Sequence, residues 1–159
     1  MASKKSYVIT LSNNKTEKQA IDFLLSTNKN FLLPSKEGRK EVVKKLGLDS
    51  SYARTFDLIL IDGHTNQEDV IEITDTDQII LVEVKSTMKF LPNLPYGFFF
   101  GATENEFNLA IKLENNFKFC FVSLHENSMS YKLLDLHELN AVIKNKRTQF
   151  QINLKTRPD

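Results

Sequence analysis

Two apolar runs that contain charged residues constrain the fold of this 159-residue chain more than any other feature. Residues 56–61 have the sequence Phe-Asp-Leu-Ile-Leu-Ile, and residues 79–87 have the sequence Ile-Ile-Leu-Val-Glu-Val-Lys-Ser-Thr. Their length and their branched residues are typical of buried strands. Because side chains alternate between the two faces of a strand, Glu83 and Lys85 share one face and the flanking valines share the other. Charges in such apolar surroundings are unfavourable unless they are paired or bound to a metal ion.

Length and composition predict a single domain that spans residues 1–159. Hydrophobic residues make up 41% and charged residues 26% of the chain, which is ordinary for a globular protein with a sizeable core. The sequence contains no internal repeat, low-complexity tract or Gly/Ser-rich linker. Cys120 is the only cysteine, which excludes a disulfide within the chain and a cysteine-based zinc site.

Neither a membrane span nor a secretion signal is apparent in the sequence. No apolar run approaches the roughly 18–20 residues that a membrane-spanning helix needs. The first residues, Met-Ala-Ser-Lys-Lys-Ser, precede no apolar signal-peptide region. We therefore expect no membrane association and an intracellular, cytoplasmic protein.

Charge is distributed unevenly along the chain, although the formal net charge is only +1. Residues 1–54 contain 11 Lys and Arg against 5 Asp and Glu, whereas residues 55–110 contain 2 against 10. Residues 111–159 are again basic, with 8 against 5. An acidic middle between basic ends suits a cation site inside a surface that meets phosphate groups. The alternative is that these blocks simply scatter over the folded surface.

Apolar periodicity and capping signals predict four helices. Ser35 is a candidate N-cap for a helix that ends near Leu46, just before Gly47. Thr103 with Glu106 fits a capping box at the start of another helix. The predicted helices are residues 15–27, 35–46, 103–114 and 138–144.

Strand signals alternate with these helices along the chain. Residues 68–77 are ambiguous and could hold a short strand around Val70 and a turn at residues 75–77. The order of elements predicts an α/β or α+β domain with a central mixed β-sheet flanked by helices. The predicted strands are residues 55–61, 79–86, 98–100, 117–124, 131–136 and 150–154, the last of them at a sheet edge.

The charged residues of the two apolar runs form a candidate metal site. If the two strands pair, Asp57 and Glu83 can meet, and carboxylate oxygens are ligands that magnesium prefers. A bound magnesium ion neutralises charge on a phosphodiester and supplies hydroxide near neutral pH. Lys85 could orient the attacking water there and stabilise developing negative charge. The backbone carbonyl of Val84 would add a further ligand. A solvated ion pair between Glu83 and Lys85 is the simpler alternative.

This arrangement resembles the PD-(D/E)xK nuclease superfamily, which includes restriction endonucleases, junction resolvases and DNA-repair nucleases. Within residues 15–125, Asp57 matches the first acid of the motif, Glu83 the second acid and Lys85 the lysine. Phe56 stands where the superfamily name has proline, at a position that varies among members. The resemblance implies a restriction endonuclease-like core and hydrolysis of DNA with Mg²⁺ as cofactor, for which Mn²⁺ can substitute.

The resemblance also implies acidic residues outside the two strands. Many members of the superfamily have a glutamate on the helix before the sheet, for which Glu17 is the better candidate and Glu41 the alternative. Residues 97–122 are similar to the strand–helix–strand segment that follows the lysine, and Glu106 matches the residue that opens its helix. Each of these glutamates also fits a structural role, in a capping box or on a solvated helix surface.

Polar residues near the ends of the predicted strands are candidates for contact with DNA. The hydroxyl groups of Ser86 and Thr87 could contact phosphate or satisfy backbone groups. The basic run at residues 144–147 fits either phosphate contact or a solvated helix end. The remaining candidates lie in predicted loops: Arg54, Lys89, Asn93 and Tyr96.

Together these features predict a magnesium-dependent DNA endonuclease of restriction or repair type that acts on double-stranded DNA. Asp62 competes with Asp57 for the role of first acid, but it precedes Gly63, which favours a turn. The resemblance implies a homodimer, whose second active site would act on the opposite strand. The alternatives are a non-catalytic DNA- or protein-binding module on the same fold, and an RNA-directed nuclease.

Overall fold

A five-stranded mixed β-sheet lies at the centre of the fold. The computed structural model describes residues 2–63, 66–72 and 75–159. The strands follow one another across the sheet in chain order, with β3 and β4 parallel and the other neighbouring pairs antiparallel. A parallel pair needs a long crossover connection, and here a loop and a helix supply it. The strands are β1 (Phe31–Leu32), β2 (Leu58–Leu60), β3 (Ile80–Thr87), β4 (Phe117–Ser123) and β5 (Ser130–Leu134).

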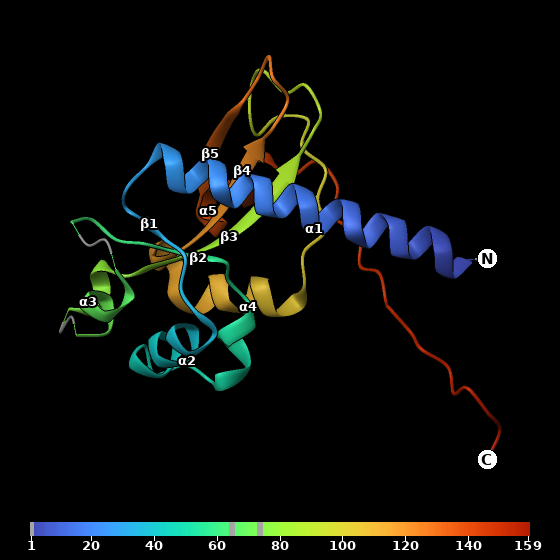
Figure 1. Ribbon diagram of the computed structural model, residues 1–159, viewed down its shortest axis with the longest axis horizontal. Coiled ribbons are helices and arrows are strands. Elements are labelled where there is room, and N and C mark those ends of the chain that lie inside the picture. The colour runs from blue at the N-terminus through green and yellow to red at the C-terminus, as the bar shows by residue number, and fades with distance from the viewer. Residues whose placement is uncertain (1, 64–65, 73–74) are drawn as a thin grey trace.

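Helices flank this sheet on both faces, which confirms the predicted mixed α/β architecture (Figure 1). The helix α1 (Ala2–Thr27) lies across one face, and its N-terminal half extends beyond the sheet. Within the described residues, no helix is both long and apolar enough to span a bilayer. The opposite face is covered by α2 (Lys36–Lys45), α3 (Gln67–Glu72), α4 (Glu104–Leu113) and α5 (Leu136–Val142), together with the 3-10 helix η1 (Ser50–Arg54); η2 (Thr76–Gln78) and η3 (Glu114–Asn116) are further 3-10 turns.

An apolar layer holds α1 to its face of the sheet. Ala20 and Leu24 of α1 are completely buried against Val82, Val84 and Cys120. These three sheet residues are adjacent members of the parallel pair, since Val84 and Cys120 are partners in the β3–β4 register. The C-terminal half of α1 is therefore fixed relative to β3, the strand that carries the Glu-x-Lys sequence.

A phenylalanine-rich layer covers the other face. Phe117, Phe119 and Phe121 alternate along β4 and are buried against the shorter helices. Burial of one such ring contributes about 1.5–3 kcal/mol. Because side chains alternate in the same way along β3, Glu83 and Lys85 point toward this layer and toward α4.

The predicted ends of two helices are confirmed by their capping contacts. The Ser35 hydroxyl accepts a hydrogen bond from the backbone N–H of Gly38 at 3.0 Å, at the start of α2. Gly47 follows this helix with φ of +70°, a conformation that glycine adopts without strain. At α4, Thr103 and Glu106 form both hydrogen bonds of a capping box.

The predicted strand at residues 98–100 is wrong. Phe98 and Phe100 instead place their rings 5.0 Å from the ring of Phe121 in T-shaped contacts, whereas Phe99 is 93% exposed. The two rings that pack on Phe121 anchor this segment, and the Phe98 N–H donates to the carbonyl of Pro95 at 3.0 Å rather than to a neighbouring strand. The segment therefore forms a loop over the sheet and joins no strand ladder among the described residues.

The predicted edge strand at residues 150–154 is also wrong. Phe150, Ile152 and Leu154 are 80%, 75% and 85% exposed, and the C-terminal segment extends away from the body of the molecule (Figure 1). Alternating apolar residues form a strand only where a neighbouring strand accepts their backbone hydrogen bonds. Within the described chain, this segment has no such neighbour.

The ambiguous stretch at residues 68–77 begins as a helix rather than a strand. Val70 is buried as part of α3, and Ile73, which belongs to the same ambiguous stretch, lies outside the described residues. The predicted turn is confirmed, because the Asp75 side chain caps η2. The two-residue strand β1 was not predicted, since so short a segment has no detectable periodicity.

Candidate active site

Asp57 lies directly before β2 and is fixed by hydrogen bonds to β3. Its backbone N–H donates to the carbonyl of Val82 at 2.8 Å, and its Oδ2 accepts from the N–H of Val84 at 2.8 Å. The antiparallel register pairs Leu58 with Val82, which brings Asp57 beside Glu83. The two strands therefore pair, which was the condition for the two acids to meet, and the acids lie at the same end of the pair.

Lys85 is held between two glutamates from different elements. Its Nζ lies 3.3 Å from Glu83 Oε1, and 3.1 Å and 3.2 Å from the two carboxylate oxygens of Glu106. Glu106 also accepts the backbone N–H of Thr103 at 2.7 Å, so one residue both caps α4 and binds the lysine. The side chains of Lys85, Glu83 and Glu106 are only 13%, 12% and 10% exposed. This contact gives Glu106, which was predicted as an accessory residue, a place at the site.

Glu17 reaches the same cluster from α1. The pKa of Glu17 is raised to about 7, first by burial and then by the charge of Asp57 and a hydrogen bond shared with Asp57. Lys85 and Arg39 act in the opposite direction. Of the two helix glutamates considered from the sequence, the structure brings Glu17 to Asp57, whereas Glu41 is exposed on α2.

The carboxylates of the cluster repel one another. The pKa of Glu83 is raised to about 10, first by burial and then by the charge of Asp57, while the charge of Lys85 offsets part of the rise. The charge of Glu106 and a hydrogen bond with it are smaller causes of the same rise. Four carboxylic acids thus surround one ammonium group, and they cannot all ionise at low cost without additional positive charge.

Arg39 supports the site, although the sequence analysis did not select it. Its Nη1 donates to the carbonyl of Phe56 at 3.0 Å, and its Nη2 lies 3.5 Å from the carbonyl of Asp57. The guanidinium also lies over the Phe56 ring, 5.9 Å from its centroid. A signal was present in the sequence: Arg39 precedes the buried residues Val42 and Val43 by three and four positions, which places it on the inward face of α2.

Asp62, the competing candidate for first acid, lies at the opposite end of β2. It is exposed, and its Oδ1 accepts a hydrogen bond from the Asn30 side chain at 3.3 Å. Gly63, the residue that follows, has φ of +79°, as expected for a turn. Asp62 is thus a turn residue, and Asp57 is the acid that the structure brings to Glu83.

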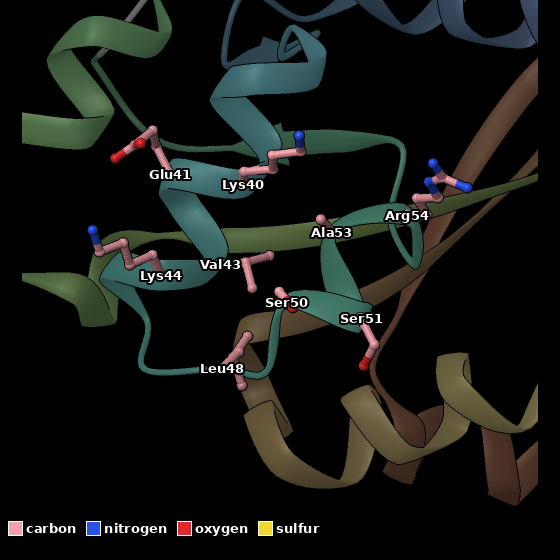
Figure 2. Close-up of a pocket in the computed structure, with 9 residues that line it drawn as sticks. All are labelled: Lys40, Glu41, Val43, Lys44, Leu48, Ser50, Ser51, Ala53 and Arg54. Atoms are coloured by element: carbon pink, nitrogen blue, oxygen red, sulfur yellow. The ribbon is translucent and has the colours of Figure 1, made fainter.

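The candidates for contact with DNA have different surroundings. Ser86 and Thr87 are half-buried at the end of β3, and the Thr87 hydroxyl accepts the backbone N–H of Lys89 at 3.2 Å. The Asn93 carbonyl accepts the N–H of Tyr96 at 2.9 Å, and the Tyr96 side chain is 66% exposed. Lys89 is exposed as well. Arg54 lies elsewhere, in a pocket between α2 and η1 (Figure 2).

The donor atoms of the cluster suit a hard divalent cation. Asp57, Glu83 and Glu17 offer carboxylate oxygens, and magnesium needs only one or two of these because it retains several waters. Within the described residues, no three side chains of His, Cys, Asp or Glu are arranged to hold one ion. Two of these carboxylates, with a backbone oxygen and waters, would suffice for such a site.

Comparisons with protein-family models, curated proteins and solved structures find no match for this chain.

Proposed function

We propose that this protein is a metal-dependent DNA endonuclease of restriction or repair type, built on a restriction endonuclease-like core. One observation carries the proposal: Asp57, Glu83 and Lys85 come from two paired strands and meet at one end of them, with Glu83 and Lys85 in contact. Structural ion pairs are normally solvated, whereas here the side chains of Glu83 and Lys85 are almost 90% buried. Buried charged groups of this kind are typical of active sites, and hydrolysis of a phosphodiester requires charged groups at the scissile phosphate.

Each residue of the cluster has a role in the proposed reaction. Asp57 and Glu83 would hold Mg²⁺ or Mn²⁺, and the Val84 carbonyl would add a ligand. When bound, the cation supplies an activated water and neutralises charge on the phosphate. Lys85 orients that water and stabilises the negative charge that develops during attack.

The neighbouring groups position these residues. The Val84 N–H fixes one oxygen of Asp57, and Arg39 holds the backbone on either side of the Phe56–Asp57 bond. Glu106 keeps the Lys85 ammonium at the site. Glu17, with a pKa of about 7, is able to exchange a proton near neutral pH.

The proposed substrate is double-stranded DNA, and the proposed active form is a homodimer. Two copies related by a two-fold axis would present one site to each strand of the duplex. The resemblance of the Asp57, Glu83 and Lys85 pattern to restriction-type nucleases supports this assembly.

Cleavage of DNA by the wild type and by Lys85→Ala tests the proposal. Supercoiled plasmid and duplex oligonucleotides of varied sequence are incubated with protein and Mg²⁺ or Mn²⁺, and an EDTA reaction serves as blank. Lys132→Ala is the matched control, because it removes an exposed lysine from β5 of the same sheet. We expect cleavage by the wild type and by Lys132→Ala, and none by Lys85→Ala. No cleavage by the wild type, or equal cleavage by Lys85→Ala, contradicts the proposal.

A second candidate function is a non-catalytic DNA- or protein-binding module on the same fold. The observation in its favour is that Lys85 is engaged by two glutamates, one of which also caps α4, so the network has a folding role. If the module binds DNA, this function predicts that DNA binding persists without cleavage under every metal condition. It also predicts that Lys85→Ala lowers thermal stability and leaves DNA affinity unchanged.

A further inference from the structure

A pocket of about 730 Å³ lies between α2 and η1, apart from the carboxylate cluster. Val43, Leu48 and Ala53 form its apolar part, as Figure 2 shows. The polar residues that line it are Lys40, Glu41, Lys44, Ser50, Ser51 and Arg54. Positive charges thus outnumber the single carboxylate, and the proposed function does not yet use this pocket.

The charged side chains of the pocket separate into two groups. In Figure 2, Lys40 and Arg54 extend toward one end of the pocket, whereas Glu41 and Lys44 extend toward the other. Two cations therefore lie on one side of the pocket without a lining carboxylate, whereas a cation and an anion lie on the other side. Only the first end has the charge distribution that an anion requires.

The two cations at the first end are available for a ligand. Lys40 forms an ion pair with Glu37, in which Nζ and Oε1 are 3.6 Å apart. Both side chains of this pair are largely exposed, at 54% and 78%. Such a pair contributes little and is readily exchanged for a stronger partner. Arg54 has no acidic partner within the described residues.

The two cations at this end of the pocket are close in the chain to residues that position Asp57. Lys40 follows Arg39, which donates to the carbonyls of Phe56 and Asp57. Arg54 precedes Asp57 by three residues, at the end of η1. Both cations therefore belong to two packed helices, α2 and η1, and η1 leads directly into the segment that carries Asp57.

We propose that Lys40 and Arg54 each bind a backbone phosphate of the nucleic-acid substrate that is cleaved at the carboxylate cluster. This inference rests on the proposed function. The planar guanidinium of Arg54 is suited to two parallel hydrogen bonds with phosphate oxygens, and the Lys40 ammonium supplies a point charge. Because phosphates are the same at every base pair, the contact sets register and affinity, and it carries no sequence specificity.

Salt-dependent binding of a fluorescent 30-base-pair duplex by the full chain in EDTA tests the inference. The double variant Lys40→Gln/Arg54→Gln is compared with Lys44→Gln, which removes a lysine from the other end of the same pocket. We expect the double variant to bind about tenfold more weakly near 0.15 M salt, with a slope of log K against log salt that is smaller by about two. Lys44→Gln should bind within about twofold of the wild type, with an unchanged slope.

Two results would overturn the inference: equal losses in the double variant and in Lys44→Gln, or no loss in the double variant. The same holds if the wild type does not bind duplex at any salt concentration. Circular dichroism and melting temperature confirm that each variant is folded before its affinity is compared.

Cleavage assays separate this inference from the proposed function. If the wild type cleaves DNA and the double variant cleaves with raised KM and unchanged kcat, both stand. If the wild type cleaves and the double variant has the same KM, the phosphate contact is refuted and the nuclease stands. If nothing cleaves but the binding differences are as expected, the phosphate contact stands and the nuclease is refuted.

Discussion

The two ends of the β2–β3 strand pair carry similar acidic residues in opposite environments. At one end, Asp57 and Glu83 lie in a cluster where the Glu83 side chain is only 12% exposed. At the other end, Asp62 and Asp77 line an open hollow and are exposed. There, Asp62 accepts a hydrogen bond from the Asn30 side chain, and Asp77 lies in the 3-10 turn η2.

The difference lies in how much solvent reaches the carboxylates. At the buried end, desolvation is the largest cause of the raised pKa values of Glu83, about 10, and of Glu17, about 7. Repulsion between carboxylates is strong where water is excluded and weak where water surrounds them. A bound cation would relieve this repulsion at the buried end, whereas the exposed acids are already stabilised by water. Burial, and not the number of acids, distinguishes the candidate active site.

The largest effect is expected from Asp57→Asn, compared with Asp62→Asn at the opposite end. Asparagine keeps the size of Asp57 but removes the charge that would hold the metal. Loss of a residue that only supports a metal ligand costs about 10–100-fold in activity, so loss of the ligand should exceed 100-fold. Asp62→Asn should change the rate less than about twofold, because this side chain is solvated. Initial rates of plasmid cleavage measure both effects. Similar losses of rate in the two variants would refute the claim that only the buried end of the strand pair is the active site.

Glu83→Gln is expected to stabilise the metal-free protein at alkaline pH. The folded state raises the pKa of Glu83 from 4.5 to about 10, so the fold binds this proton more tightly than the unfolded chain does. That contribution to stability is complete below pH 4.5 and is lost as pH rises toward about 10. Glutamine removes the titration, so the variant should lose less stability than the wild type between pH 5 and pH 9.

Melting temperatures in EDTA across this pH range test the expectation, with Asp77→Asn as the control at the exposed end. Asp77→Asn should follow the wild-type curve. If the melting temperature of Glu83→Gln changes with pH in parallel with that of the wild type, the surroundings of Glu83 do not raise its pKa.

A smaller effect is expected from Glu106→Gln, compared with Glu104→Gln in the same helix turn. Glutamine retains an acceptor for the Thr103 N–H but no longer pairs as an anion with Lys85. Loss of this ion pair should raise the activation free energy by about 1.4 kcal/mol, which corresponds to a roughly tenfold slower reaction. Glu104 is exposed, so its variant should match the wild type. The ratio of the two cleavage rates measures the effect, and a ratio near one would remove Glu106 from the site.

The sequence predicted the central strands because long apolar runs leave few alternatives, and their pairing then brings the two acids together. Residues 79–86 are nearly coincident with β3, and the capping box at Thr103 and Glu106 is local, so it forms wherever the helix begins. The choice of Asp57 over Asp62 also depended on local information, since a residue before glycine favours a turn. Predictions of this kind concern neighbours in the chain or within one strand pair.

The remaining features depend on contacts between distant segments. Phe98 and Phe100 lie in a loop and pack their rings against Phe121, so an apolar run there does not imply a strand. Residues 150–154 have the alternation of a strand but no partner within the described chain. Arg39 required knowledge that α2 packs beside the start of β2, which periodicity alone does not supply.

Binding of Mn²⁺ tests most directly the central claim that the buried acids form a divalent-cation site. Mn²⁺ is titrated into the metal-free wild type, Glu83→Gln and Asp77→Asn, and the free ion is followed by electron paramagnetic resonance. We predict saturable binding by the wild type and by Asp77→Asn, and its loss in Glu83→Gln. Absence of binding by the wild type, or equal binding by Glu83→Gln, would contradict the claim.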